Sequence, residues 1–179
     1  MPSLLPAVPT SLMQRPLSTA SPLPQEPVAP VDLAAVLAGA RTLQNEAGAG
    51  PTHDALRGKK IGIFCETNDA PDAVLFRGAA LELGAHVAHL RPSLSALSTP
   101  QEVHDTARML GRLYDAVECQ GMAPDLVRQI GIDAGVPVYD GLASAQHSTS
   151  RLVEQLDGDG TRADKRRVVL QAMLLATLT

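Results

Sequence analysis

Short apolar runs that alternate with longer helix-like segments constrain the fold of this chain more than any other feature. Residues 61–65 read Ile-Gly-Ile-Phe-Cys, and residues 115–119 form a second, similar run. A continuous apolar run is typical of a strand covered on both faces of a parallel sheet, whereas a half-exposed strand alternates apolar and polar residues. Strands that alternate with helices predict a doubly wound α/β domain, and 179 residues are enough for one core.

The expected elements follow one another in a regular order. The expected strands are residues 61–65, 86–90, 115–119 and 136–139, and Pro137 places the last of them at an edge of the sheet. The expected helices are residues 33–43 after a cap at Asp32, then 73–83, 103–113 after a Thr99/Glu102 capping box, 124–134, 147–156 and 164–178. Together they predict a four-stranded parallel sheet flanked by helices.

Composition excludes several classes of function. Prolines interrupt every apolar run of residues 1–30, so we expect a disordered tail there, followed by one domain over residues 31–179. We expect neither a signal peptide nor a membrane-spanning segment, and therefore a cytoplasmic protein. The net charge of −4 and the 2% aromatic content argue against nucleic-acid binding. No His/Cys cluster has ligand spacing, so we expect no metal and no cofactor, with Cys65 and Cys119 as buried thiols.

The turn after the first expected strand has the geometry of an anion site but the opposite charge. A strand that leads into a helix N-terminus gathers free N–H groups that favour an anion. This turn carries Glu66, Asp69 and Asp72, and no Lys or Arg lies between Lys60 and Arg77. Asp69 and Asp72 can serve as helix caps. Alternatively, the three carboxylates and His147 line a pocket for an amine ligand or a divalent metal.

Three sequence blocks follow the motifs of one enzyme family, in the same order along the chain. Residues 102–117 read Glu-Val-His-Asp-Thr-Ala-Arg-Met-Leu-Gly-Arg-Leu-Tyr-Asp-Ala-Val, close to the family's Glu-Ser-x-x-Asp-Thr-Ala-Arg-Val-Leu-Ser-Arg-Tyr-x-Asp-Ala-Ile. Residues 136–142, Val-Pro-Val-Tyr-Asp-Gly-Leu, match Val-Pro-Val-Ile-Asn-Gly-Leu. The third block joins residues 56–61 to residues 79–86. In these blocks the chain resembles the carbamoyl-phosphate-binding half of ornithine and aspartate carbamoyltransferases, closer to the ornithine branch. The resemblance covers most of residues 31–156 and implies that family's fold.

The same resemblance implies that the phosphate-binding motif is degenerate. The family's Ser-Thr-Arg-Thr-Arg falls on residues 69–73, which read Asp-Ala-Pro-Asp-Ala. The resemblance places a further family arginine at the position of Gln120. The family's His-Pro-Cys-Gln falls on residues 147–150, which keep His147 and lose the glutamine. The ligand-binding candidates are therefore Glu66, Asp69, Asp72, Gln120 and His147, and we expect no catalytic residue among them.

The resemblance also implies a reduced architecture. In the family, a second, amino-acid-binding domain separates the helix at the His-Pro-Cys-Gln motif from a closing helix. Here residues 157–161 alone separate residues 147–156 from residues 164–178, which are similar to that closing helix. We expect the second domain to be absent and the closing helix to pack back on the first.

These features favour a non-catalytic carbamoyltransferase-like protein that acts as a binding, regulatory or assembly subunit. Because family members trimerise through this domain, the expected partner is a second copy of the chain or an active carbamoyltransferase. One alternative is a carbamoyltransferase whose activity is completed by a partner chain. Another is a sensor of a small amine or cation that uses the acidic turn.

Overall fold

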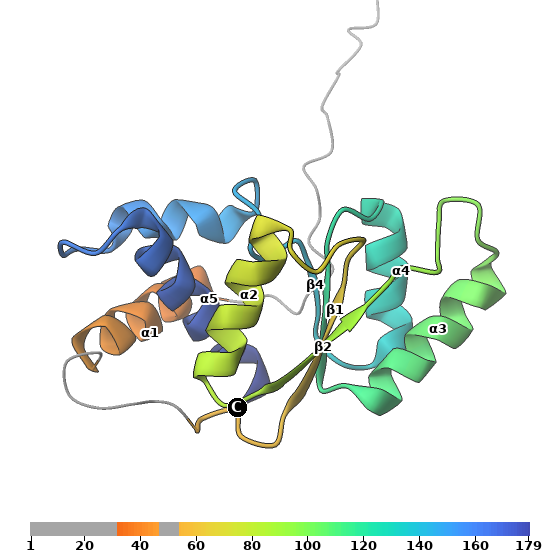
Figure 1. Ribbon diagram of the computed structural model, residues 1–179, viewed down its shortest axis with the longest axis horizontal. Coiled ribbons are helices and arrows are strands. Elements are labelled where there is room, and N and C mark those ends of the chain that lie inside the picture. The colour runs from red at the N-terminus through yellow and green to blue at the C-terminus, as the bar shows by residue number, and fades with distance from the viewer. Residues whose placement is uncertain (1–31, 47–53) are drawn as a thin grey trace, which may run out of the picture.

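A twisted sheet lies between two groups of helices in the computed structural model, which describes residues 32–46 and 54–179 (Figure 1). The expected disordered tail of residues 1–30 lies outside the described residues. The strands are β1 (Lys60–Phe64), β2 (His86–Leu90), β3 (Ala116–Cys119) and β4 (Val138–Asp140). All neighbours are parallel, in the order β2-β1-β3-β4. The predicted four-stranded parallel sheet is confirmed, and β4 lies at an edge.

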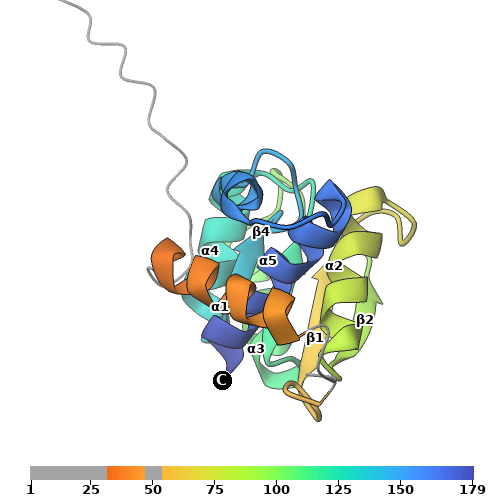
Figure 2. The same ribbon diagram turned by 90° about the vertical axis from the view of Figure 1, so that its left-hand side faces the viewer.

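Helices cover both faces of the sheet. On one face α2 (Pro71–Glu82) and α5 (Arg162–Leu178) lie against the strands, and α1 (Leu33–Glu46) packs on α5 (Figure 2). On the other face lie α3 (Pro100–Leu113) and α4 (Pro124–Ala134), which pack on each other. Because both faces are covered, all four residues of β3 are buried. This burial is the physical reason for the continuous apolar runs in the sequence.

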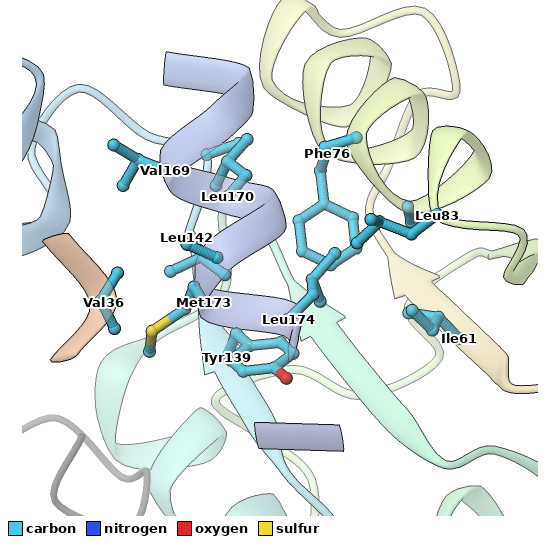
Figure 3. Packing of buried hydrophobic residues seen from close by; sticks show 14 of the residues in the cluster. Val36, Ile61, Phe76, Leu83, Tyr139, Leu142, Val169, Leu170, Met173 and Leu174 are labelled. Atoms are coloured by element: carbon cyan, nitrogen blue, oxygen red, sulfur yellow. The ribbon is translucent and has the colours of Figure 1, made fainter. Parts of the chain in front are cut away.

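The larger of the two hydrophobic clusters joins α5 to the sheet and to α2. Leu170 and Leu174 of α5 are fully buried, and they lie beside Phe76 of α2 and Tyr139 of β4 (Figure 3). Burying a leucine side chain contributes about 1.5–3 kcal/mol to folding. The short segment between the two final helices therefore returns the chain to its own sheet.

Caps and prolines move several element boundaries from their expected positions. The helix expected from residue 73 begins at Pro71, because proline suits the first helical turn. The closing helix begins at Arg162, because Thr161 and Asp164 form a capping box. Residues 147–156, expected as an ordinary helix, instead contain the 3₁₀ helix η1 (Ser148–Gln155). The strand expected at residues 136–139 begins at Val138, after Pro137.

Two capping predictions are confirmed. The Asp32 carboxylate accepts a hydrogen bond from the Ala34 N–H at 2.9 Å, immediately before α1. The Thr99 hydroxyl accepts from the Glu102 N–H at 3.3 Å, and the Glu102 carboxylate accepts from the Thr99 N–H at 2.7 Å. Both local signals in the sequence therefore form the contacts expected of them.

Candidate functional site

The carboxyl ends of the central strands β1 and β3 define the candidate site. Strand order reverses between these two strands, because β1 leads outward to β2 and β3 leads outward to β4. In open α/β sheets, ligands bind outside the carboxyl ends of the strands at such a switch point. The acidic turn follows β1, Gln120 follows β3, and His147 lies in the segment after β4.

The carboxylates of the turn do not cap α2. The N-cap of α2 is Ala70, and no side chain accepts a hydrogen bond there, so the prediction that Asp69 and Asp72 act as caps is wrong. Asp72 is half-buried in the first helical turn, where a negative charge suits the helix dipole. Glu66 and Asp69 are exposed. Their charges are therefore directed at solvent.

An arginine from α2 reaches the turn, although the turn itself has no basic residue. The Arg77 guanidinium donates to the Asn68 carbonyl oxygen at 2.8 Å and also to the Asn68 side-chain oxygen. These bonds fix the loop that separates β1 from α2. Arg77, the first basic residue after the turn, therefore binds the protein's own backbone.

Gln120, which follows β3, forms a hydrogen bond to a buried acid. Its amide donates to the Glu118 carboxylate at 3.1 Å, and the Leu142 N–H donates to the same carboxylate at 3.2 Å. Glu118 is fully buried in β3, and burial raises the pKa of its carboxyl to about 8. Gln120 thus serves as an internal hydrogen-bond donor to an acid of its own strand.

A buried arginine of the closing helix lies at the same edge. The Arg166 guanidinium donates to the carbonyl oxygens of Leu142 at 2.5 Å and Ser144 at 2.8 Å, and to the Thr149 hydroxyl at 3.0 Å. Arg166 is 7% exposed, and burial lowers its pKa, while the charges of Asp72 and Glu118 oppose that shift. The acidic edge therefore contains its own compensating cation.

His147 begins the 3₁₀ helix η1. Its Nδ1 accepts from the Thr149 N–H at 3.2 Å and lies 2.9 Å from the Thr149 hydroxyl, which in turn accepts from Arg166. A ring nitrogen that accepts from a backbone N–H carries no proton, so the other nitrogen, Nε2, is protonated in the neutral ring. His147 thus has the helix-start role, and its Nδ1 is occupied.

The structure brings together three of the five candidate residues and leaves two outside. Hydrogen bonds through Glu118, Leu142, Arg166 and Thr149 connect Gln120 to His147, and Asp72 faces the same arginine electrostatically. Glu66 and Asp69 join no such network among the described residues. Sequence reasoning missed Glu118, although a carboxylate inside an apolar strand run signals a buried charge. It also missed Arg166, which lies in the basic run Lys165-Arg166-Arg167.

The described part of the chain contains no disulfide, no metal-binding cluster and no membrane-spanning helix. Cys65 and Cys119 pack in different clusters on opposite faces of the sheet, so they cannot pair with each other. Within residues 32–46 and 54–179 no group of three or more His, Cys, Asp or Glu side chains could hold a metal ion. None of the helices described has the length and apolar character needed to cross a bilayer.

Comparison with known proteins identifies the family of this chain. Residues 25–157, which make up most of the chain, match the family model for the carbamoyl-P binding domain of aspartate/ornithine carbamoyltransferases. The chain belongs to the aspartate/ornithine carbamoyltransferase family. Its similarity to an ornithine carbamoyltransferase of Actinobacillus pleuropneumoniae (serotype 5b, strain L20) is 36% identity over 116 residues. That match covers 65% of this chain and 35% of the relative.

Solved structures of carbamoyltransferases share the fold. Ornithine carbamoyltransferase from Pyrococcus furiosus matches with a TM-score of 0.58 and 26% identity, over 69% of this chain and 39% of that one. The enzyme from Burkholderia thailandensis E264 gives the same TM-score at 20% identity, over 69% and 42%. This chain therefore spans about a third of the length of the curated carbamoyltransferases that it matches.

Proposed function

We propose that this chain is a non-catalytic, cytoplasmic member of the carbamoyltransferase family that acts as a binding, regulatory or assembly subunit. The observation that carries the proposal is the charge of the turn between β1 and α2. Residues 69–73 read Asp-Ala-Pro-Asp-Ala, where the family resemblance implies Ser-Thr-Arg-Thr-Arg. The nearby cations Arg77 and Arg166 are already engaged with backbone carbonyl oxygens.

The energetic consequence of this exchange is large. Each charge-assisted hydrogen bond to an anion contributes roughly 1.5–3 kcal/mol. Losing two arginines and adding two carboxylates should therefore weaken carbamoyl phosphate binding beyond the millimolar range. Acyl transfer to an amine also needs electrostatic stabilisation of its transition state, which the same cations would supply.

Exposed apolar side chains support a role in assembly. Val74 and Leu81 on α2 are 50% and 52% exposed, and Met109 and Leu113 on α3 are 51% and 53% exposed. Two different faces that bind each other form a heterologous interface, which closes into a ring when the rotation allows. The trimer implied by the family resemblance is an assembly of this kind, and we propose that α2 of one copy meets α3 of the next.

A carbamoyltransferase completed by a partner chain is the second candidate. The observation that favours it is that this chain matches 35% of its curated relative. In this hypothesis a partner supplies the amino-acid-binding domain and the missing basic residues. The test measures formation of citrulline and carbamoyl-aspartate by the purified chain, alone and with a carbamoyltransferase from the same source. We expect no product from the chain alone and no added product in the mixture; turnover in the mixture above that of the transferase favours the second candidate.

A third candidate, an amine sensor, rests on the exposed carboxylates Glu66 and Asp69. Thermal denaturation with spermidine and with arginine tests it. A saturable stabilisation that the Glu66→Gln, Asp69→Asn double variant abolishes would support this sensor. An unchanged melting temperature excludes binding of these two amines at the turn.

A further inference from the structure

A pocket of about 470 Å³ lies at the edge of the sheet opposite the acidic turn. It is formed where the chain enters β1, β3 and β4 and where α3 and α5 end. Its lining includes Lys59, Lys60, Arg112, Tyr114, Val136 and Leu178. A volume of this size is within the range of small-ligand sites.

The pocket has an excess of positive charge in a chain of net charge −4. The acidic residue in the lining is Asp115, and both of its carboxylate oxygens have partners. Oδ1 lies 3.7 Å from the Lys59 ammonium, and Oδ2 accepts a hydrogen bond from the Lys60 N–H at 2.8 Å. The side chains of Lys60 and Arg112 have no ion pair or hydrogen bond with any residue in the described ranges. Among the described residues, no side chain compensates the charge of these two cationic groups.

Helix dipoles decide which anion suits this charge. The carboxyl ends of α3 and α5 both contribute to the lining, and each carries a partial charge of about −0.5. These partial charges lower the positive potential that the two cations create in the lining. A singly charged anion therefore suits the pocket better than a phosphate dianion.

The apolar part of the lining specifies the rest of the ligand. Leu113, Val136, Pro137 and Leu178 line the pocket beside the charged groups. We propose that this pocket binds a small monocarboxylate with an apolar body, whose carboxylate is held by Lys60 and Arg112. The site uses no residue of the acidic edge, and it shares only Leu113 with the exposed apolar side chains proposed for assembly.

The test is an amide-resolved NMR titration of the full chain with sodium butyrate. Gly58 and Gly111 line the pocket, whereas Gly121 and Gly141 follow β3 and β4 at the opposite edge. We expect saturable shifts at Gly58 and Gly111 and none at Gly121 and Gly141. Neutral butyramide, at matched ionic strength, should give no saturation. Saturation by butyramide, an absence of saturation by butyrate, or tighter binding of inorganic phosphate would each overturn the proposal.

Charge-removing variants complete the test. Lys60→Gln and Arg112→Gln should each weaken butyrate binding roughly tenfold, the effect of losing one charge-assisted contact. Arg151→Gln is the matched control, because Arg151 is also exposed and lies in η1, outside the pocket. Equal affinities for Arg112→Gln and Arg151→Gln would contradict the assigned role of Arg112. A failure here leaves the acidic-edge proposal untouched, because the glycines of each edge report separately.

Discussion

Glu118 and Arg166 hold the two polar backbone groups of one residue, Leu142. The Glu118 carboxylate accepts from the Leu142 N–H at 3.2 Å, and the Arg166 guanidinium donates to the Leu142 carbonyl oxygen at 2.5 Å. One side chain comes from the central strand β3 and the other from the closing helix α5. This arrangement ties α5 to the carboxyl edge of the sheet.

Stability should depend on pH through Glu118. Burial raises the pKa of its carboxyl from 4.5 to about 8 in the folded protein. Between these values the unfolded chain has lost the proton that the folded chain still binds, so the free energy of unfolding falls as pH rises. The loss should reach about 4 kcal/mol at most across this window. Urea denaturation at pH 5 and at pH 8 measures it.

The variant Glu118→Gln isolates this effect. Glutamine resembles the neutral acid and keeps an oxygen for the Leu142 N–H, so its stability should no longer fall with pH for this reason. Glu154→Gln, on an exposed residue that pairs with Arg162, is the control and should keep the wild-type pH dependence. The same pH slope in Glu118→Gln as in the wild type would show that Glu118 does not titrate in this window.

Removing the Arg166 guanidinium should strongly destabilise the fold. Arg166→Met keeps the apolar length of the side chain but leaves the Leu142 and Ser144 carbonyl oxygens without this donor. Breaking such a buried charged network costs about 3–5 kcal/mol. Arg151→Met, on an exposed arginine of η1, should change the free energy of unfolding by less than about 0.5 kcal/mol. A similar small change for Arg166→Met would contradict the anchoring role of Arg166.

Gly111 permits the close crossing of α3 and α4. A Cβ atom added there would lie 1.8 Å from the Ala134 carbonyl oxygen, so Gly111→Ala must separate the two helices. We expect a loss of about 2–3 kcal/mol of stability. Gly78→Ala in α2 meets nothing within 4 Å, and should instead stabilise the protein by up to about 1 kcal/mol. Thermal denaturation of both variants measures this difference in stability. Equal melting temperatures for Gly111→Ala and Gly78→Ala would contradict the close contact at Gly111.

Self-association should depend on the exposed face of α3. Met109→Glu places a charge among the apolar side chains proposed to meet α2 of a second copy, and should shift the assembly to monomer. Ile132→Glu is the control, because Ile132 is 68% exposed on α4, outside that face. Light scattering coupled to size-exclusion chromatography gives the molar mass of each. A monomeric wild-type protein would refute the assembly role of this face.

Local signals in the sequence predicted most of the fold, and non-local contacts account for what they missed. The apolar run at residues 61–65 and the Thr99/Glu102 box lie within single elements, so spacing alone revealed them. Arg77 and Arg166 were missed because each binds a loop outside its own helix. The cap expected at Asp69 and Asp72 was wrong because Ala70 begins α2 without a side-chain bond. The charge of the turn alone therefore did not predict the charge of the carboxyl edge, because arginines from α2 and α5 also lie there.

The most direct test of the central claim is binding of carbamoyl phosphate to the purified chain, followed by ³¹P NMR, with an active ornithine carbamoyltransferase as the positive control. The acidic turn should repel the negatively charged carbamoyl phosphate, so we expect no saturable change in its ³¹P signal up to several millimolar ligand. Saturable binding at or below one millimolar would contradict the account, and would show that other residues replace the missing arginines.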